Sequence, residues 1–144
     1  MIAVDTNILV YAHREDSPNH AAALAVLRDL AAGAASWAIP WPCVHEFLAV
    51  VTHPRIYSPP SSALVALEAV DALAALPNVR FLHETSGHLT ELRTLITQGD
   101  VRGARVHDAR VAAICIAHGV SELWSADRDF SWFPGLRTVN PLVR

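Results

Sequence analysis

The chain has 144 residues, of which 52% are hydrophobic and only 17% charged, with a formal net charge of −3. This length and composition predict one folded domain over residues 1–144, and the low charge favours an apolar interface with a partner or a second copy. All 11 basic residues are Arg, which excludes mechanisms that need a lysine, such as P-loop phosphate binding or Schiff-base chemistry.

The expected elements alternate between short apolar strands and helices. Strands are expected, in chain order, at residues 2–4, 36–39, 79–82, 123–125 and 136–139. Helices are expected at 7–13, from Ser17-Pro18 to about 32, from Pro42 to about 53, from the cap at 59–62 to about 76, at 86–98, and at 108–118 before Gly119. This alternation predicts an α/β fold with helices on both faces of a parallel sheet.

The two cysteines and the apolar segments indicate the compartment. Cys43 and Cys115 fit neither a disulfide framework nor a CxxC site, so we expect buried thiols in a reducing environment. The N-terminus has no basic region typical of an export signal, and Gly and Pro interrupt the longest uncharged run. We therefore expect a cytoplasmic protein with no membrane contact.

Two acidic residues directly follow predicted strands. Asp5 follows the first strand, and Asp127 comes just after the fourth. Active sites of open α/β sheets lie beyond the carboxyl ends of the strands, so the two carboxylates approach each other if their strands are neighbours. The alternative for Asp5 is that it only caps the next helix.

Two further acids stand out on helices. Asp108 opens the most apolar helix, where the helix dipole favours a carboxylate, so a plain cap is again the alternative. Glu46 borders the core-facing arc of its own helix. It lies either exposed at the margin or in a cleft.

Convergence of Asp5, Glu46, Asp108 and Asp127 would require protons or a cation to neutralise their charge. Like charges about 5 Å apart repel by roughly 3 kcal/mol per pair at an effective dielectric of about 20. Oxygen ligands without Cys or His suit Mg²⁺ or Mn²⁺, and such a site can cleave phosphodiesters. The neighbouring side chains that could orient these ligands by hydrogen bonds are Thr6, Asn7 and Ser125.

Other polar residues near these acids leave alternatives open. Asp129 is either a fifth acid or a turn cap. The eight histidines show no HExxH pattern, so we expect solvated or locally hydrogen-bonded rings rather than a zinc site. The arginines near the acids either contact phosphates or are solvated; they are Arg14, Arg102, Arg105, Arg110 and Arg128.

Four segments together resemble the acidic motifs of the PIN domain, and most closely the VapC-type toxins of bacterial type II toxin–antitoxin pairs. They are Val4–Leu9, His45–Phe47, His107–Ala109 and Ser125–Phe130, and they occur in the family's order. The resemblance implies a three-layer α/β/α sandwich with a parallel sheet of four to five short strands. It also implies a Mg²⁺- or Mn²⁺-dependent endoribonuclease acting on tRNA or rRNA, a homodimer, and a cognate antitoxin that covers the site.

The resemblance assigns the metal to Asp5, Glu46, Asp108 and Asp127, the last being favoured over Asp129 because it comes first after the strand. The alternatives are a PIN nuclease of RNA processing without a toxin role and a binding module whose acids only cap helices. A phosphatase with Asp5 as nucleophile and a receiver domain both lack the lysine they need. Substrate choice is expected in loops such as 52–61 and 99–106.

Overall fold

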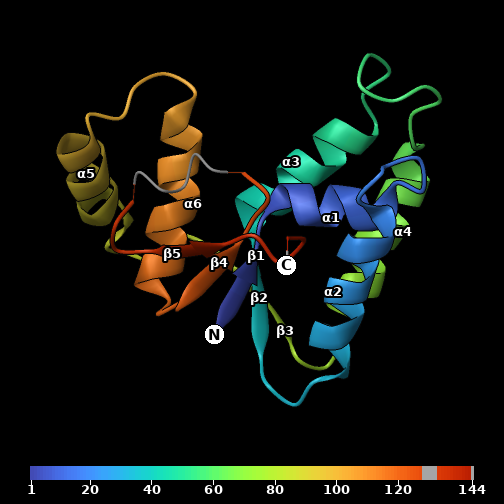
Figure 1. The fold of residues 1–144 in the computed structure, drawn as a ribbon. Helices are drawn as coiled ribbons and strands as arrows, with labels where there is room; N and C mark the ends of the chain where they lie inside the picture. Colours follow the sequence, from blue (N-terminus) through green and yellow to red (C-terminus); the bar gives the residue numbers. More distant parts are fainter. Residues whose placement is uncertain (128–132, 144) are drawn as a thin grey trace.

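The computed structural model describes residues 1–127 and 133–143. Its centre is a parallel sheet with the strand order β3-β2-β1-β4-β5 (Figure 1). The strands are β1 (Ile2–Val4), β2 (Trp37–Pro40), β3 (Val79–Leu82), β4 (Glu122–Trp124) and β5 (Arg137–Val139). All five lie within one residue of the predicted positions, and the parallel sheet is confirmed.

The strands form because short apolar runs become buried on both faces of the sheet. Ala3, Val4 and the whole of β2 are buried, as expected for central strands of a parallel sheet. The chain runs outward from β1 through β2 to β3, and then returns so that β4 pairs with the other side of β1. Beyond the carboxyl end of β1, therefore, the connections diverge, and this is where α/β folds form a crevice.

Helices cover both faces of the sheet and give three layers (Figure 1). On one side lie α1 (Thr6–His13), α2 (His20–Ala32), α3 (Trp41–Val51) and α4 (Ala63–Ala74), and on the other α5 (His88–Gly99) and α6 (Arg105–Ala117). The predicted cap of α4 is confirmed, since the Ser62 hydroxyl accepts a hydrogen bond from the Val65 amide at 3.1 Å. Gly119 has a φ of +71°, in keeping with its predicted place just after α6.

Two predicted helix starts are wrong. The segment at Ser17-Pro18 forms a turn, in which the Ser17 carbonyl accepts from the His20 amide, and α2 begins only at His20. Conversely, α6 begins at Arg105, three residues before Asp108, because the chain already turns at Gly103 with a φ of +60°. Asp108 therefore lies in the first turn of α6 and does not cap it.

The core lies between the sheet and the two helical layers. The helix α6 is central, as predicted, with six buried residues between Ala109 and Cys115. Both cysteines are buried and unpaired, also as predicted. Among the described residues, no helix is both long and apolar enough to cross a membrane.

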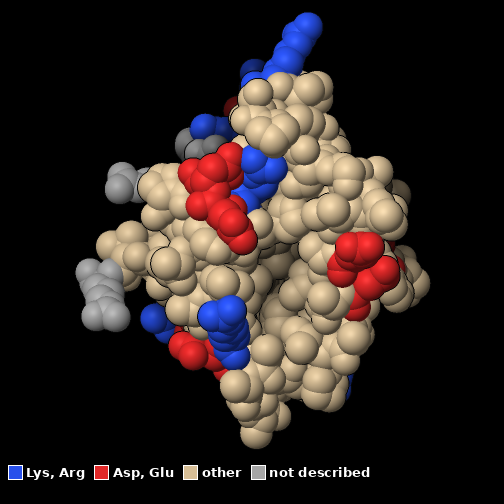
Figure 2. Space-filling model, turned by 90° about the vertical axis from the view of Figure 1, so that its right-hand side faces the viewer, with Lys and Arg blue, Asp and Glu red and all other residues tan. Residues whose placement is uncertain are grey.

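A second feature of the fold is an apolar groove on the side of α1–α4. It has a volume of about 400 Å³ and is lined mainly by α1, α2 and α4, with Leu9, Leu27 and Leu73 among its residues. Figure 2 shows this side of the molecule, which is hollowed at its centre and carries few charged residues there. Leu64, Val65 and Leu67 of α4 are also exposed. This side of the molecule therefore presents an accessible apolar surface.

Candidate active site

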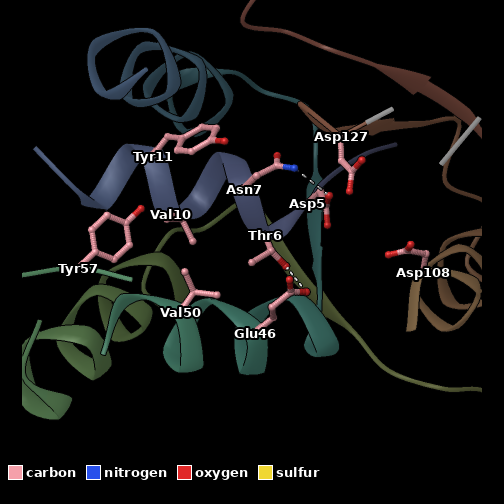
Figure 3. A pocket seen from close by; sticks show the side chains of 10 residues that line it. All are labelled: Asp5, Thr6, Asn7, Val10, Tyr11, Glu46, Val50, Tyr57, Asp108 and Asp127. Carbon is pink, nitrogen blue, oxygen red and sulfur yellow. Dashed lines mark hydrogen bonds between the residues drawn. The ribbon is translucent and has the colours of Figure 1, made fainter. Parts of the chain in front are cut away.

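All four predicted acids line one pocket of about 330 Å³ beyond the carboxyl ends of β1 and β4 (Figure 3). The pocket is lined by Asp5, Thr6, Asn7, Val10, Tyr11, Glu46, Val50, Tyr57, Asp108 and Asp127. Asp5 and Asp127 come from the ends of neighbouring strands, Glu46 from α3 and Asp108 from α6. Sheet and both helical layers therefore each contribute at least one carboxylate.

Asp5 is at the centre of this group and is only 6% exposed. It precedes α1, but its side chain makes no capping hydrogen bond. Its carboxylate instead accepts hydrogen bonds from Ser125 Oγ at 2.7 Å, Asn7 Nδ2 at 3.3 Å and Cys43 Sγ at 3.5 Å. Burial raises the pKa of Asp5, the hydrogen bonds from Ser125 and Cys43 oppose this shift, and the charge of Glu46 adds to it.

A polar network joins the ends of β1 and β4. The Asp5 amide donates to the Trp124 carbonyl at 2.9 Å, which continues the ladder between the strands. Asn7 donates to Ser125 Oγ at 3.1 Å and accepts from the Ala126 amide at 3.0 Å. Ser125 Oγ also accepts from the Asp127 amide at 3.0 Å. Asn7 and Ser125 thus hold the segment that carries Asp127 against Asp5.

Glu46 satisfies both alternatives considered from the sequence. The residue is exposed, yet its side chain lines the pocket and accepts a hydrogen bond from Thr6 Oγ1 at 3.2 Å. The Thr6 hydroxyl also lies 3.5 Å from the Cys43 carbonyl of α3. Thr6 therefore orients Glu46 from across the pocket. Asp108 points from α6 toward the same space (Figure 3).

The chemistry of this pocket suits a cation. Its lining includes four carboxylates and, among the described residues, no arginine or histidine. The three donors to Asp5 are all neutral, so its buried charge has no basic partner among them. Within residues 1–127 and 133–143, no three His, Cys, Asp or Glu side chains are already close enough together to hold a metal ion. The set of oxygen donors is nevertheless the one that Mg²⁺ and Mn²⁺ prefer.

A second pocket, of about 570 Å³, adjoins the first on the side of α3 and α6. It shares Asp5, Glu46 and Asp108 with the first pocket, and it adds the basic or titratable side chains of His45, Arg105, His107 and Arg110. Arg105 and Arg110 therefore lie beside the carboxylates, as the sequence suggested, and Arg110 also forms a salt bridge with Glu84.

Arg14 and Arg102 are not among the residues that line either pocket. Arg14 pairs with Asp16 at 2.7 Å, and Arg102 pairs with Asp100 at 3.1 Å on the surface. Arg128 and Asp129 lie outside the described residues.

Tyr11 and Tyr57 line the pocket but were not singled out in the sequence. Tyr11 is on α1, and Tyr57 is in the loop between α3 and α4, one of the two loops expected to govern substrate choice. No spacing pattern in the sequence points to either tyrosine. Cys43 was predicted only as a buried thiol, and its contact with Asp5 was not foreseen.

Fold and pocket together define a parallel α/β domain with a carboxylate site at the point where its strand order reverses. The model of the PIN domain family matches residues 2–136, and the chain belongs to this family. Ribonuclease VapC43 of Mycobacterium tuberculosis is 37% identical over 142 residues, which cover 99% of this chain and 96% of the relative.

Two solved structures have the same fold. The Mycobacterium tuberculosis toxin VapC20, described as cleaving the sarcin-ricin loop, has a TM-score of 0.69 at 17% identity over 91% of this chain and 93% of its own. VapBC2 from Rickettsia felis, bound to a promoter DNA fragment, has a TM-score of 0.68 at 22% identity over 97% and 98% of the two chains. The three-layer fold expected from the resemblance is thereby confirmed.

Proposed function

We propose that this protein is the toxin of a type II toxin–antitoxin pair and acts as an endoribonuclease that hydrolyses RNA phosphodiester bonds. The observation that carries the proposal is the placement of Asp5, Glu46, Asp108 and Asp127 around one pocket. Membership of the PIN family and the similarity to a VapC ribonuclease over 99% of the chain support it. The printed activity of VapC20 favours structured RNA, such as rRNA or tRNA, as the substrate class.

The proposal includes Mg²⁺ or Mn²⁺ as cofactor, with Asp5 and Asp108 as the principal ligands and Glu46 and Asp127 completing the site. When bound, such an ion lowers the pKa of a water molecule and stabilises the negative charge that develops on the leaving oxygen. The chain's own residues prepare this chemistry. Ser125 fixes one carboxylate oxygen of Asp5, and Thr6 fixes one of Glu46. Both oxygens are therefore positioned in advance.

Among the described residues, this pocket has no nucleophilic Ser, Cys or Lys arrangement. Ser125 is only 1% exposed and its hydroxyl donates to Asp5, while the Cys43 thiol is fully buried and its pKa is raised by burial. Water is therefore the nucleophile in this proposal, and Glu46 or Asp127 at the open side of the pocket would accept its proton.

The test is cleavage of total tRNA and rRNA by the purified protein with Mg²⁺ or Mn²⁺. Discrete fragments are expected from the wild type, and they should disappear with EDTA and in Asp108→Ala. Asp71→Ala is the matched control, because Asp71 is an exposed acid of α4 outside the pocket. Full cleavage by Asp108→Ala, or cleavage that survives the chelator, would contradict the proposed site.

An antitoxin is the proposed protein partner. The solved VapBC2 structure supports a partner of this kind, and the charge-poor groove between α1, α2 and α4 supplies an apolar surface that a partner segment would cover. Growth arrest on expression, relieved by the product of a neighbouring gene for a small DNA-binding protein, is the expected result. Cleavage without growth arrest would instead favour a PIN nuclease of RNA processing.

Homodimer formation and a cytoplasmic location are also part of the proposal. The exposed side chains of Leu64, Val65 and Leu67 on α4 favour an interface between copies. Two unpaired cysteines suit a reducing compartment. Light scattering of the purified protein measures the first, and a monomer at micromolar concentration would contradict it.

A further inference from the structure

The carboxylate pocket has a second end whose lining side chains carry no charge. Tyr11 of α1 and Tyr57 of the loop after α3 lie there, with Val10 and Val50 between them and the acids (Figure 3). Both rings are partly buried. The pocket therefore changes over its length from four carboxylates to two aromatic rings and two aliphatic side chains.

Tyr57 is held in place by Arg14. The guanidinium carbon of Arg14 lies 4.3 Å from the centre of the Tyr57 ring, and the Arg14 side chain is only 12% exposed. Arg14 also donates hydrogen bonds to Ser61 Oγ at 3.3 Å and to the Pro59 carbonyl at 3.1 Å, which ties the loop to the end of α1. Burial raises the pKa of the Tyr57 phenol, so the ring is uncharged at neutral pH. The aromatic end is thus preformed.

The second pocket and the tyrosine end of the first pocket, which lie on either side of the carboxylates, offer different chemistry. The pocket toward α6 contains Arg105, Arg110, His45 and His107, which suit the phosphates of a nucleic-acid strand. The tyrosine end has no cationic side chain among its described lining residues, and Arg14 behind Tyr57 is already paired with Asp16, so this end is poorly suited to a phosphate. A flat, neutral, aromatic group fits it better.

We propose that the end formed by Val10, Tyr11, Val50 and Tyr57 binds one unpaired nucleobase of the RNA, next to the phosphodiester held at the carboxylates. This inference rests on the proposed function and assigns these four residues to recognition of the base beside the cleaved bond. Bases in loops and bulges stack on aromatic side chains in this way, whereas bases within a duplex are not available. The pocket volume of about 330 Å³ is at the lower end of the range of ligand pockets.

The test measures binding separately from cleavage. The probes are a short fluorescein-labelled single-stranded RNA of random sequence and an abasic ribose-phosphate strand of the same length. Their Kd values are measured by fluorescence anisotropy with Mg²⁺ in an Asp108→Asn background, so that RNA is not consumed. In this background Tyr57→Leu removes the ring, and Tyr57→Phe keeps it and removes only the hydroxyl.

Tyr57→Leu is expected to raise the Kd for the base-bearing RNA about 5- to 150-fold, the equivalent of roughly 1–3 kcal/mol of base stacking. Tyr57→Phe should leave it nearly unchanged, and neither variant should alter the Kd for the abasic strand. The salt dependence of binding should also be unchanged, because no phosphate contact is lost.

Three results would overturn the proposal: no preference of the Asp108→Asn protein for the base-bearing strand, equal losses of Tyr57→Leu on both strands, or no loss at all. If the wild type cleaves no RNA and the Asp108→Asn protein still prefers the base-bearing strand, the nuclease function is refuted and the base site is retained.

Discussion

Ser125→Ala tests whether the polar network at the ends of β1 and β4 holds the site together. Ser125 Oγ donates to the Asp5 carboxylate at 2.7 Å and accepts from Asn7 Nδ2 and from the Asp127 amide. The side chain is 1% exposed, so water does not readily replace it. The substitution removes one oxygen and leaves a buried carboxylate with its shortest hydrogen bond missing.

The expected loss in the free energy of unfolding follows from the hydrogen bond between Ser125 and Asp5. A hydrogen bond to a charged group contributes about 1.5–3 kcal/mol, while the groups of Asn7 and Asp127 are partly exposed and recover some solvation. We expect Ser125→Ala to lower the free energy of unfolding by about 2 kcal/mol and Tm by about 6 °C at neutral pH. Cleavage should fall as well, because Asp5 and Asp127 lose their common partner.

The cost should depend on pH. The Ser125 hydroxyl lowers the pKa of Asp5 against the larger effect of burial, which raises it. Without that hydroxyl the pKa of Asp5 rises further, so the variant loses most stability at pH values at which Asp5 is ionised. The difference in stability between wild type and Ser125→Ala should therefore shrink as pH falls through the titration of Asp5 in the folded protein and grow as pH rises through it.

Urea unfolding in the presence of EDTA, followed by circular dichroism at several pH values, measures both effects. Ser121→Ala is the matched control, since Ser121 also joins β1 to β4, through hydrogen bonds with Met1, but is exposed at the opposite end of the strand. A loss in Ser125→Ala no larger than in Ser121→Ala, or one independent of pH, would refute the reasoning.

Three further predictions concern other parts of the molecule. Burial raises the pKa of Cys115 to about 12, and burial also raises the pKa of Cys43 well above its usual value, so neither thiol should react with Ellman's reagent until the protein is unfolded; rapid labelling of the native protein would contradict this. Arg105→Gln should reduce the slope of log Kd against log salt for single-stranded RNA by about 0.7, and an unchanged slope would argue against a phosphate contact. Phe47→Ala should cost about 3–5 kcal/mol in urea unfolding, since the ring is 2% exposed, and a loss below about 1 kcal/mol would show that the core collapses around it.

The strands were predictable because each is a short apolar run between turn residues. Residues 2–4 and 79–82 were placed with the bounds that the structure shows. Helix starts were harder to predict, because Ser17-Pro18 fits a helix cap and a turn equally well. In the structure, the hydrogen bond from the His20 amide to the Ser17 carbonyl shows that the segment is a turn. At Gly103 the sequence indicated a loop, but a single residue of positive φ is enough to begin α6 at Arg105.

The site was predictable to the extent that topology determines it. Asp5 and Asp127 follow strands that turn out to be neighbours, so their approach needed only the strand order. Whether Glu46 is exposed or faces a cleft depends on how α3 packs, and helical periodicity does not settle a position at the edge of the apolar arc. The position of Tyr57 in the pocket could not be predicted, because it depends on Arg14. Arg14 holds the loop through contacts that no spacing rule describes.

The position of the site makes it depend on the whole fold. Asp5 and Asp127 follow strands of the sheet. Glu46 belongs to the helical layer of α1–α4, and Asp108 belongs to the layer of α5 and α6. No single layer holds more than two of the four carboxylates. A substitution that loosens the packing of α6 on the sheet would therefore move Asp108 away from the others without touching the pocket. Loss of activity alone does not identify a residue of this site, and a change in stability has to be measured beside it.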